Sequence, residues 1–174
     1  MVQNVPVPTR LVIISDTHVP QRSRGLPAAL WTAIEAADLV IHAGDWNGLP
    51  LLDEVEARAA RLLAVRGNND GPEFERRLPE VAEADIEGIA LSVVHETGPA
   101  DGRELRMDAR FPDADVLVFG HSHIPWDTTT SRGLRLLNPG SPTDKRRQPT
   151  GTYLTAVADA GVLRDLELVP VARD

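Results

Sequence analysis

Several apolar runs of the sequence end in side chains that can bind a metal ion. The residues that follow five such runs are aspartate, asparagine and histidine only: Asp16 and His18, Asp45, Asn68, His95, and His121 and His123. For the pair His121 and His123 alone, a polar cap at the end of a strand is the simpler interpretation. Caps do not explain a set that takes up four of the five histidines. Two carboxylates, one amide oxygen and four imidazoles suit divalent manganese, iron, cobalt, nickel or zinc.

The spacing of the two histidines fits a pair of ions. In extended backbone, residues i and i+2 point the same way, with Cα atoms roughly 6.5–7 Å apart. The ions of two-metal sites lie roughly 3.5–4 Å apart. His121 and His123 can therefore each reach one ion from the same side.

The first half of the chain alternates between strand and helix patterns. We predict strands at 10–15, 38–44 and 61–67, and helices at 26–37 and 49–60. This order favours a parallel sheet with helices packed on it. In open α/β sheets, ligands bind beyond the carboxyl ends of the strands, which is where the polar residues fall.

The second half of the chain has more strand patterns than helix patterns. We predict strands at 81–88 and 89–95, joined around Glu87 and Gly88, then a helix at 102–111 and a strand at 115–120. Four further strands follow at 125–133, 134–138, 151–159 and 162–171, with turns at Arg132-Gly133 and Ala160-Gly161. We assign these four strands to a second sheet. The length of 174 residues favours a single domain over 1–174.

Composition limits the partners and the compartment. A net charge of −8 argues against broad electrostatic binding to nucleic acid or to an anionic membrane surface. The absence of cysteine excludes disulfides and thiolate metal sites. The first residues lack a hydrophobic signal core, and no apolar run is long enough to cross a membrane. We therefore expect a cytoplasmic protein. The sequence does not decide whether it forms a homo-oligomer.

Other enzyme classes lack their motifs. The sequence contains neither G-x-G-x-x-G nor G-x-x-x-x-G-K-[ST], so the usual phosphate-binding loops of nucleotide-binding folds are missing. It also lacks the G-x-S-x-G of a serine hydrolase, and it has no cysteine to act as a nucleophile.

The order of the motifs resembles the calcineurin-like metallophosphoesterases. The matching residues are Asp16-x-His18, Gly44-Asp45, Gly67-Asn68, His95 and Gly120-His121-x-His123. The segments VRGNND (65–70) and LNPGSP (137–142) are more narrowly similar to a branch of small bacterial and archaeal phosphodiesterases. The resemblance implies an α/β fold: a four-layer α/β/β/α sandwich of two mixed sheets flanked by helices.

The resemblance also implies a dinuclear site and a reaction. Asp16, His18, Asp45 and His123 would bind one ion, and Asp45, Asn68, His95 and His121 the other, with Asp45 as the bridge. Manganese is the favoured metal, with zinc, iron, nickel and cobalt as alternatives. A bridging water would attack the phosphorus of a small-molecule phosphate ester, most plausibly a diester, and Asp45, Asn68 and His95 would serve catalysis as well as binding. Two divalent cations outweigh the charges of Asp16 and Asp45, so the site suits an anionic substrate.

Two departures from the family pattern bear on function. Many relatives have a histidine that can protonate the leaving group where this chain has Asn69, and a His-Gly-His where it has His95-Glu96-Thr97. Glu96 is an alternative proton donor. The same changes fit a second hypothesis, a catalytically weak or inactive protein-binding scaffold like the retromer subunit of this superfamily. We favour the enzyme because all seven ligands are present.

The remaining polar candidates have structural alternatives of at least equal weight. His42 can support the site or be a buried, hydrogen-bonded histidine, and Asp70 is more easily explained as a turn cap. Arg22, Arg24 and the basic segment 144–149 with Arg146 can grip phosphate or simply be solvated. Within NPGS (138–141), we expect a tight turn near the metals and no catalytic role for Asn138 or Gly140.

Overall fold

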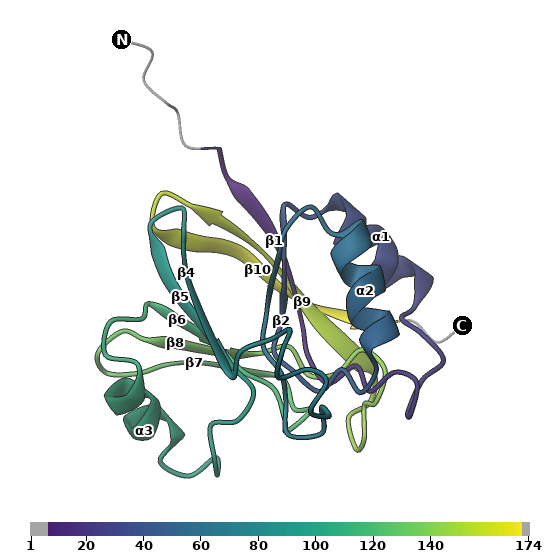
Figure 1. Ribbon diagram of the computed structural model, residues 1–174. Helices are drawn as coiled ribbons and strands as arrows, with labels where there is room; N and C mark the ends of the chain where they lie inside the picture. The colour runs from purple at the N-terminus through teal and green to yellow at the C-terminus, as the bar shows by residue number, and fades with distance from the viewer. Residues whose placement is uncertain (1–6, 172–174) are drawn as a thin grey trace.

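The computed structural model describes residues 7–171, which form two five-stranded sheets packed face to face (Figure 1). The strand order is β10-β9-β1-β2-β3 in the first sheet and β4-β5-β6-β8-β7 in the second. No helix within the described residues is both long and apolar enough to cross a membrane.

The predicted alternation of strands and helices builds the first sheet. Its elements are β1 (Thr9–Ile14), α1 (Ala28–Ala36), β2 (Leu39–His42), α2 (Leu49–Arg58) and β3 (Leu62–Ala64). The three strands are parallel, with Ile13 beside Ile41 and Ile41 beside Leu63. The helices are shorter than predicted by a few residues at their ends, because Ala37 and Ala59 already have extended backbone.

The second sheet begins with the predicted hairpin. Strands β4 (Val81–Ile86) and β5 (Ile89–Val94) pair antiparallel around Glu87 and Gly88, both with positive φ (53° and 84°), as tight hairpin turns require. The helix α3 (Arg103–Arg110) then leads to β6 (Val116–Val118), which runs parallel to β5. Strand β8 (Arg135–Asn138) is parallel to β6, and β7 (Trp126–Thr129) forms the antiparallel edge.

The prediction that the last four strands all belong to the second sheet is wrong for two of them. Strands β9 (Gly151–Asp159) and β10 (Val162–Val171) extend the first sheet, with β9 antiparallel to β1. The alternating pattern of β9 identifies a strand but not its partner. Its apolar side chains, such as Leu154 and Ala156, pack between the sheets, while its backbone pairs with the free edge of β1.

Three apolar clusters separate four layers, as the resemblance implied. The central cluster lies between the sheets, with Ile13 and Ile41 on one side and Val93 and Val118 on the other. A second cluster lies between the first sheet and the helices α1 and α2 on its outer face, and a third lies under α3, on the outer face of the second sheet (Figure 1). The sandwich buries its sheets on both faces, so polar groups gather where strands end.

Candidate metal centre

The structure brings all seven predicted ligands together at the carboxyl ends of five strands. Backbone hydrogen bonds join the loops there: the amide of Asp16 donates to the carbonyl of Gly44 (2.9 Å), and that of Gly120 donates to the carbonyl of His95 (3.0 Å). The second bond links the loops after β5 and β6. The loops of both sheets therefore converge on one site.

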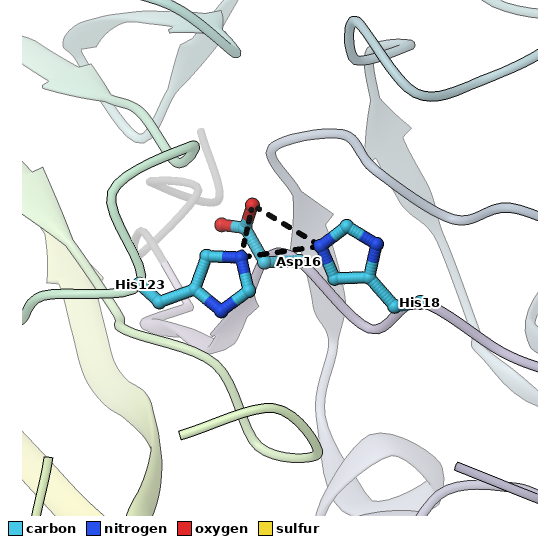
Figure 2. A group of neighbouring side chains, drawn as sticks. All are labelled: Asp16, His18 and His123. Atoms are coloured by element: carbon cyan, nitrogen blue, oxygen red, sulfur yellow. Dashed lines mark hydrogen bonds and ion pairs between the residues drawn. The ribbon is translucent and has the colours of Figure 1, made fainter. Parts of the chain in front are cut away.

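One half of the site, which we call the closed half, consists of Asp16, His18 and His123. Figure 2 shows these three side chains pointing at one another. The Nε2 atom of His123 lies 3.4 Å from Oδ1 of Asp16, and Nε2 of His18 lies 3.1 Å from Nε2 of His123. The side chains of Asp16 and His123 are 0% exposed and that of His18 is 7% exposed.

The other half, the open half, consists of Asn68, His95 and His121. Oδ1 of Asn68 lies 3.0 Å from Nε2 of His95 and 3.0 Å from Nδ1 of His121. His95 is buried, but Asn68 is exposed and the side chain of His121 is 50% exposed. This half therefore faces solvent.

Asp45 lies between the two halves, as predicted for a bridge. Its Oδ2 is 3.5 Å from Nε2 of His18, and its Oδ1 is 3.3 Å from Nε2 of His95. Asp16 is also close to both halves, since its Oδ1 is 4.0 Å from Nε2 of His95. Potential ligand atoms of Asp16, His18 and His123 form one compact group, and those of Asp16, Asp45 and His95 form another.

Hydrogen bonds fix which nitrogen of each buried ring is free for a metal. Nδ1 of His95 donates to the carbonyl of Ala43 (2.7 Å), and Nδ1 of His123 donates to the carbonyl of Asp144 (2.6 Å). Nδ1 of His18 donates in the same way to Oδ1 of Asn47 (2.6 Å). A carbonyl or amide oxygen only accepts, so each ring keeps a proton on Nδ1 and turns Nε2 toward the site, where a metal ion can bind it.

This tautomer pattern is a direct test of whether a cation fits. The facing Nε2 atoms of His18 and His123 are both acceptors. Two neutral acceptors about 3 Å apart repel unless a proton or a metal ion lies between them. Imidazole nitrogens bind zinc at about 2.0–2.1 Å, a length compatible with two nitrogens 3.1 Å apart on one ion. The residues present fit divalent metal ions.

The backbone at the site adopts a conformation that side chains rarely accept. Six non-glycine residues of the site have φ between 47° and 74°, and all except Asn47 are predicted ligands: Asp16, His18, Asp45, Asn47, His121 and His123. Left-handed backbone costs free energy at residues with a Cβ atom, and such residues cluster at functional sites where the surroundings hold them. The loop backbone thus orients the ligand side chains at a cost to local stability.

Close approach of the loops explains two of the motif glycines. A Cβ atom at Gly44 (φ 92°) would lie 2.8 Å from Nδ1 of His95, and one at Gly120 would lie 2.8 Å from Oδ2 of Asp16. Real Cβ atoms do not come so near, so a side chain at either position would push ligands apart. The glycines before Asp45 and His121 therefore serve the packing of the site.

The structure assigns supporting positions to Asp70 and His42. The carboxylate of Asp70 accepts from the amides of Trp46 (2.8 Å), Asn47 (2.8 Å) and Gly67 (2.7 Å), so it ties the loop after β2 to the loop after β3. His42 is buried, accepts from the amide of Gly44 (3.1 Å) and donates to Oγ1 of Thr17 (3.0 Å). Burial lowers the pKa of His42 well below its usual value.

The loop after β8 holds the closed half in place. Oγ of Ser141 donates to the carbonyl of Asp16 (2.7 Å), and Oγ1 of Thr143 donates to that of Thr17 (2.6 Å). Asn138 donates from Nδ2 to the carbonyl of Gly120 (2.8 Å), and its Oδ1 accepts from the amide of Gly140 (2.9 Å), as in the tight turn predicted at NPGS. Sequence reasoning did not identify Ser141, Thr143 or the carbonyl of Asp144 as partners of the site.

Asn69 has a contact that the sequence did not suggest. Its backbone amide donates to Oδ1 of Asp45 (2.9 Å) and its Nδ2 donates to Oδ2 (2.7 Å). The side chain therefore orients the bridging carboxylate. Its position directly after Asn68 was the only signal in the sequence.

The arginines considered from the sequence lie at the rim. Arg22 is exposed, and its Nε is 3.9 Å from Oδ2 of Asp144. Arg24 and Arg146 are also exposed. Burial lowers the pKa of His123 to about 4, and the charge of Arg146 contributes to that shift, so this arginine lies near the closed half.

Without metal, the acidic and basic groups of the site perturb one another. Burial raises the pKa of Asp16 to about 7. Burial alone would lower the pKa of His95, but hydrogen bonding to Asp45 and the charges of Asp16 and Asp45 outweigh it and raise the pKa to about 9. Burial opposes ionisation of Asp45, yet its bonds with His95 and Asn69 hold the pKa of this carboxyl well below its usual value.

Comparisons with known proteins agree with the geometry. A family model of the calcineurin-like phosphoesterase superfamily domain matches residues 10–161. A probable metallophosphoesterase of Methanocaldococcus jannaschii is 37% identical over 135 residues, which are 77% of this chain and 68% of that protein. A protein of the same archaeon named as a phosphodiesterase is 27% identical over 164 residues, which are 88% of this chain and 92% of that protein.

Solved structures show how widely this fold is used. Vacuolar protein sorting 29 from Cryptosporidium parvum superposes with a TM-score of 0.76 over 97% of this chain and 100% of that chain. The two sequences are only 20% identical, so this likeness concerns the fold alone.

Proposed function

The chain belongs to the calcineurin-like phosphoesterase superfamily, and from this premise we propose that it is a phosphodiesterase working with two divalent metal ions. The observation that carries the proposal is the convergence of bare acceptors. Nε2 of His18 faces Nε2 of His123 at 3.1 Å, and both rings are buried. Burying two such acceptors face to face is unfavourable unless a cation lies between them.

Each half of the site would hold one ion, and Asp45 would serve both. Asp16, His18 and His123 would hold the first ion, and Asn68, His95 and His121 the second. Manganese is our first choice, and zinc, iron, nickel and cobalt suit the same mixture of oxygen and nitrogen ligands. Bound there, the ions would neutralise the phosphate and lower the pKa of a water between them to near neutrality.

The protein's own groups would position the reaction and keep its protons in place. The carbonyls of Ala43 and Asp144 hold the protons of His95 and His123 on Nδ1, which keeps Nε2 free for metal. Asn69 fixes both oxygens of Asp45 and is therefore not available to protonate a leaving group. Activity on a diester is also supported by the relative named as a phosphodiesterase.

A metal-dependence assay tests the proposal. The protein, stripped with EDTA, should not hydrolyse bis(p-nitrophenyl) phosphate, and manganese should restore hydrolysis. Metal analysis should give up to two ions per chain.

The scaffold hypothesis makes a different prediction for the same assay. A protein that binds two ions but hydrolyses neither diesters nor monoesters with any of the five metals would support the scaffold. A protein that binds no ion would contradict both the dinuclear site and the enzyme.

A further inference from the structure

A pocket of about 290 Å³ opens beside the open half of the metal centre. Its lining includes two predicted ligands and four charged side chains: Asn68, His95, Arg66, Arg110, Glu80 and Glu96. Because Asn68 and His95 form part of its wall, a phosphate at the metals would extend its other ester group into this pocket. Its volume lies at the small end of the range for ligand sites, which favours a small substrate.

The two arginines of the pocket differ in what they already bind. Nη2 of Arg66 lies 2.5 Å from Oε1 of Glu80 and 4.0 Å from Oε1 of Glu75. Arg110, in the last turn of α3, donates only a long hydrogen bond (3.4 Å) to the carbonyl of Glu96. Among residues 7–171, no carboxylate forms an ion pair with Arg110. Its guanidinium is exposed and lies 5.1 Å from the centre of the Phe111 ring, a contact that leaves its N–H groups available to bind an anion.

The far side of Arg110 has the opposite character. Arg110 also borders a neighbouring hollow of about 350 Å³, whose lining includes the acidic residues Glu83, Asp85 and Asp113. A chain of phosphates that passed Arg110 would meet these carboxylates and be repelled. In the smaller pocket Arg66 is paired with Glu80, and the carboxylate of Glu96 lies beside His121, so among the described residues Arg110 is the unpaired cation of this pocket.

We propose that Arg110 binds a second anionic group of the substrate, so that the enzyme acts on small phosphodiesters that carry one further phosphate. This inference rests on the proposed function. Arginine binds phosphate through two parallel N–H groups, which gives both affinity and orientation. Arg110 is thus the specificity-determining residue of the pocket. Arg66 lines the pocket too, but its ion pair with Glu80 holds it in place.

The test compares two p-nitrophenyl phosphodiesters of glycerol, one with a free distal hydroxyl and one with a phosphate on it. The unmodified protein should favour the phosphorylated diester by about tenfold or more in kcat/KM. Arg110→Gln should raise KM for that diester by about tenfold and leave the uncharged one within about twofold, whereas Arg110→Lys should keep part of the preference. Arg164→Gln, an exposed charge change on β10, is the matched control and should alter neither.

Two outcomes would overturn the inference while the proposed function stands. One is equal kcat/KM for the two diesters in the unmodified protein. The other is an Arg110→Gln variant, folded by circular dichroism, that affects both diesters equally. Faster cleavage of a p-nitrophenyl ester of a short oligonucleotide would overturn the restriction to small substrates.

If neither diester is hydrolysed, the proposed function fails and binding decides the role of Arg110. Inorganic pyrophosphate would be titrated into the manganese-loaded protein. Binding about tenfold weaker in Arg110→Gln than in the unmodified protein would support an anion site at Arg110. Equal binding would overturn it.

Discussion

The closed and open halves of the metal centre use similar ligands in different surroundings. In the closed half, Asp16 and His123 are fully buried and the loop after β8 covers them from the outside. In the open half, His121 is half exposed and Asn68 borders a pocket. Similar ligands are thus buried away from solvent in the closed half and exposed to solvent in the open half.

The difference in burial indicates different roles for the two halves, tight ion binding in the closed half and substrate access in the open half. In the closed half the Nε2 atoms of His18 and His123 face each other in buried surroundings and need a cation between them, so this half should hold its ion tightly and exchange it slowly. Ligands that touch solvent have water as an alternative partner, so the open half should bind its ion less tightly and admit substrate. Four predictions test this comparison.

The largest effect should come from Asp45, which both halves share. Asp45→Asn removes a charge from each ion's surroundings, and kcat/KM should fall by about a thousandfold, the upper end of what loss of one electrostatic group costs. The exposed Asp53→Asn on α2 makes the same chemical change away from the site and should have no effect. Activity of Asp45→Asn near that of the control would mean that the halves do not share a bridge.

The next effect concerns the departing oxygen, for which the open half has no evident proton donor. Asn69 uses its side-chain amide on Asp45, so aryl diesters should be cleaved about a hundredfold faster than alkyl diesters, the lower end of what a general acid contributes. A series of substituted-phenyl diesters under single-turnover conditions measures this dependence. A flat series would point to Glu96, whose Oε1 is 3.5 Å from Nδ1 of His121, and Glu96→Gln should then steepen it.

Substitution of each histidine of the last metal motif should report on the metal affinity of one half. Even residues that only hydrogen-bond to a metal ligand contribute about 10–100-fold to metal affinity. His123→Ala should therefore weaken one ion by at least about a hundredfold, and the loss at the other ion in His121→Ala should be about tenfold smaller. Manganese titration followed by electron paramagnetic resonance measures both. Equal losses would contradict the difference between the halves, and circular dichroism would confirm that each variant is folded.

The smallest effect should appear in the pH dependence of metal binding. The pKa of His123 is lowered to about 4 and that of Asp16 is raised to about 7, so at pH 8 the first ion meets a closed half without protons on these groups. The pKa of His95 is raised to about 9, so the second ion must displace a proton there. Affinity for the second ion should therefore rise about tenfold per pH unit between pH 7 and 9.

Calorimetry in two buffers of different ionisation enthalpy would count these protons. We expect about one proton released at pH 8 for the second ion and almost none for the first. Proton release that accompanies the first ion instead would reverse the assignment of the tighter site to the closed half.

Sequence patterns predicted what depends on local periodicity and could not predict what depends on long-range pairing. The alternation in 151–159 identified a strand, but its pairing with β1 is set by an edge more than 130 residues earlier in the chain. Likewise the seven ligands stand out because each follows an apolar run. Their supports do not stand out. Asp144 acts on His123 through its backbone carbonyl, which leaves no trace in residue type, and the hydroxyl of Ser141 donates to the backbone carbonyl of Asp16, a group that every residue has.

The central place of β1 has a consequence for the order in which the chain can fold. Strand β1 is made long before β9, yet it lies between β2 and β9 in the sheet. Until β9 has been made, β1 has one bare edge, and the carbonyl of Asp16 at first lacks the hydroxyl of Ser141. Contacts of such high sequence separation form slowly. The first ligand of the site to be made is therefore fixed late, because Asp16 gains its support only after the loop that carries Ser141 and the strand β9 have been made.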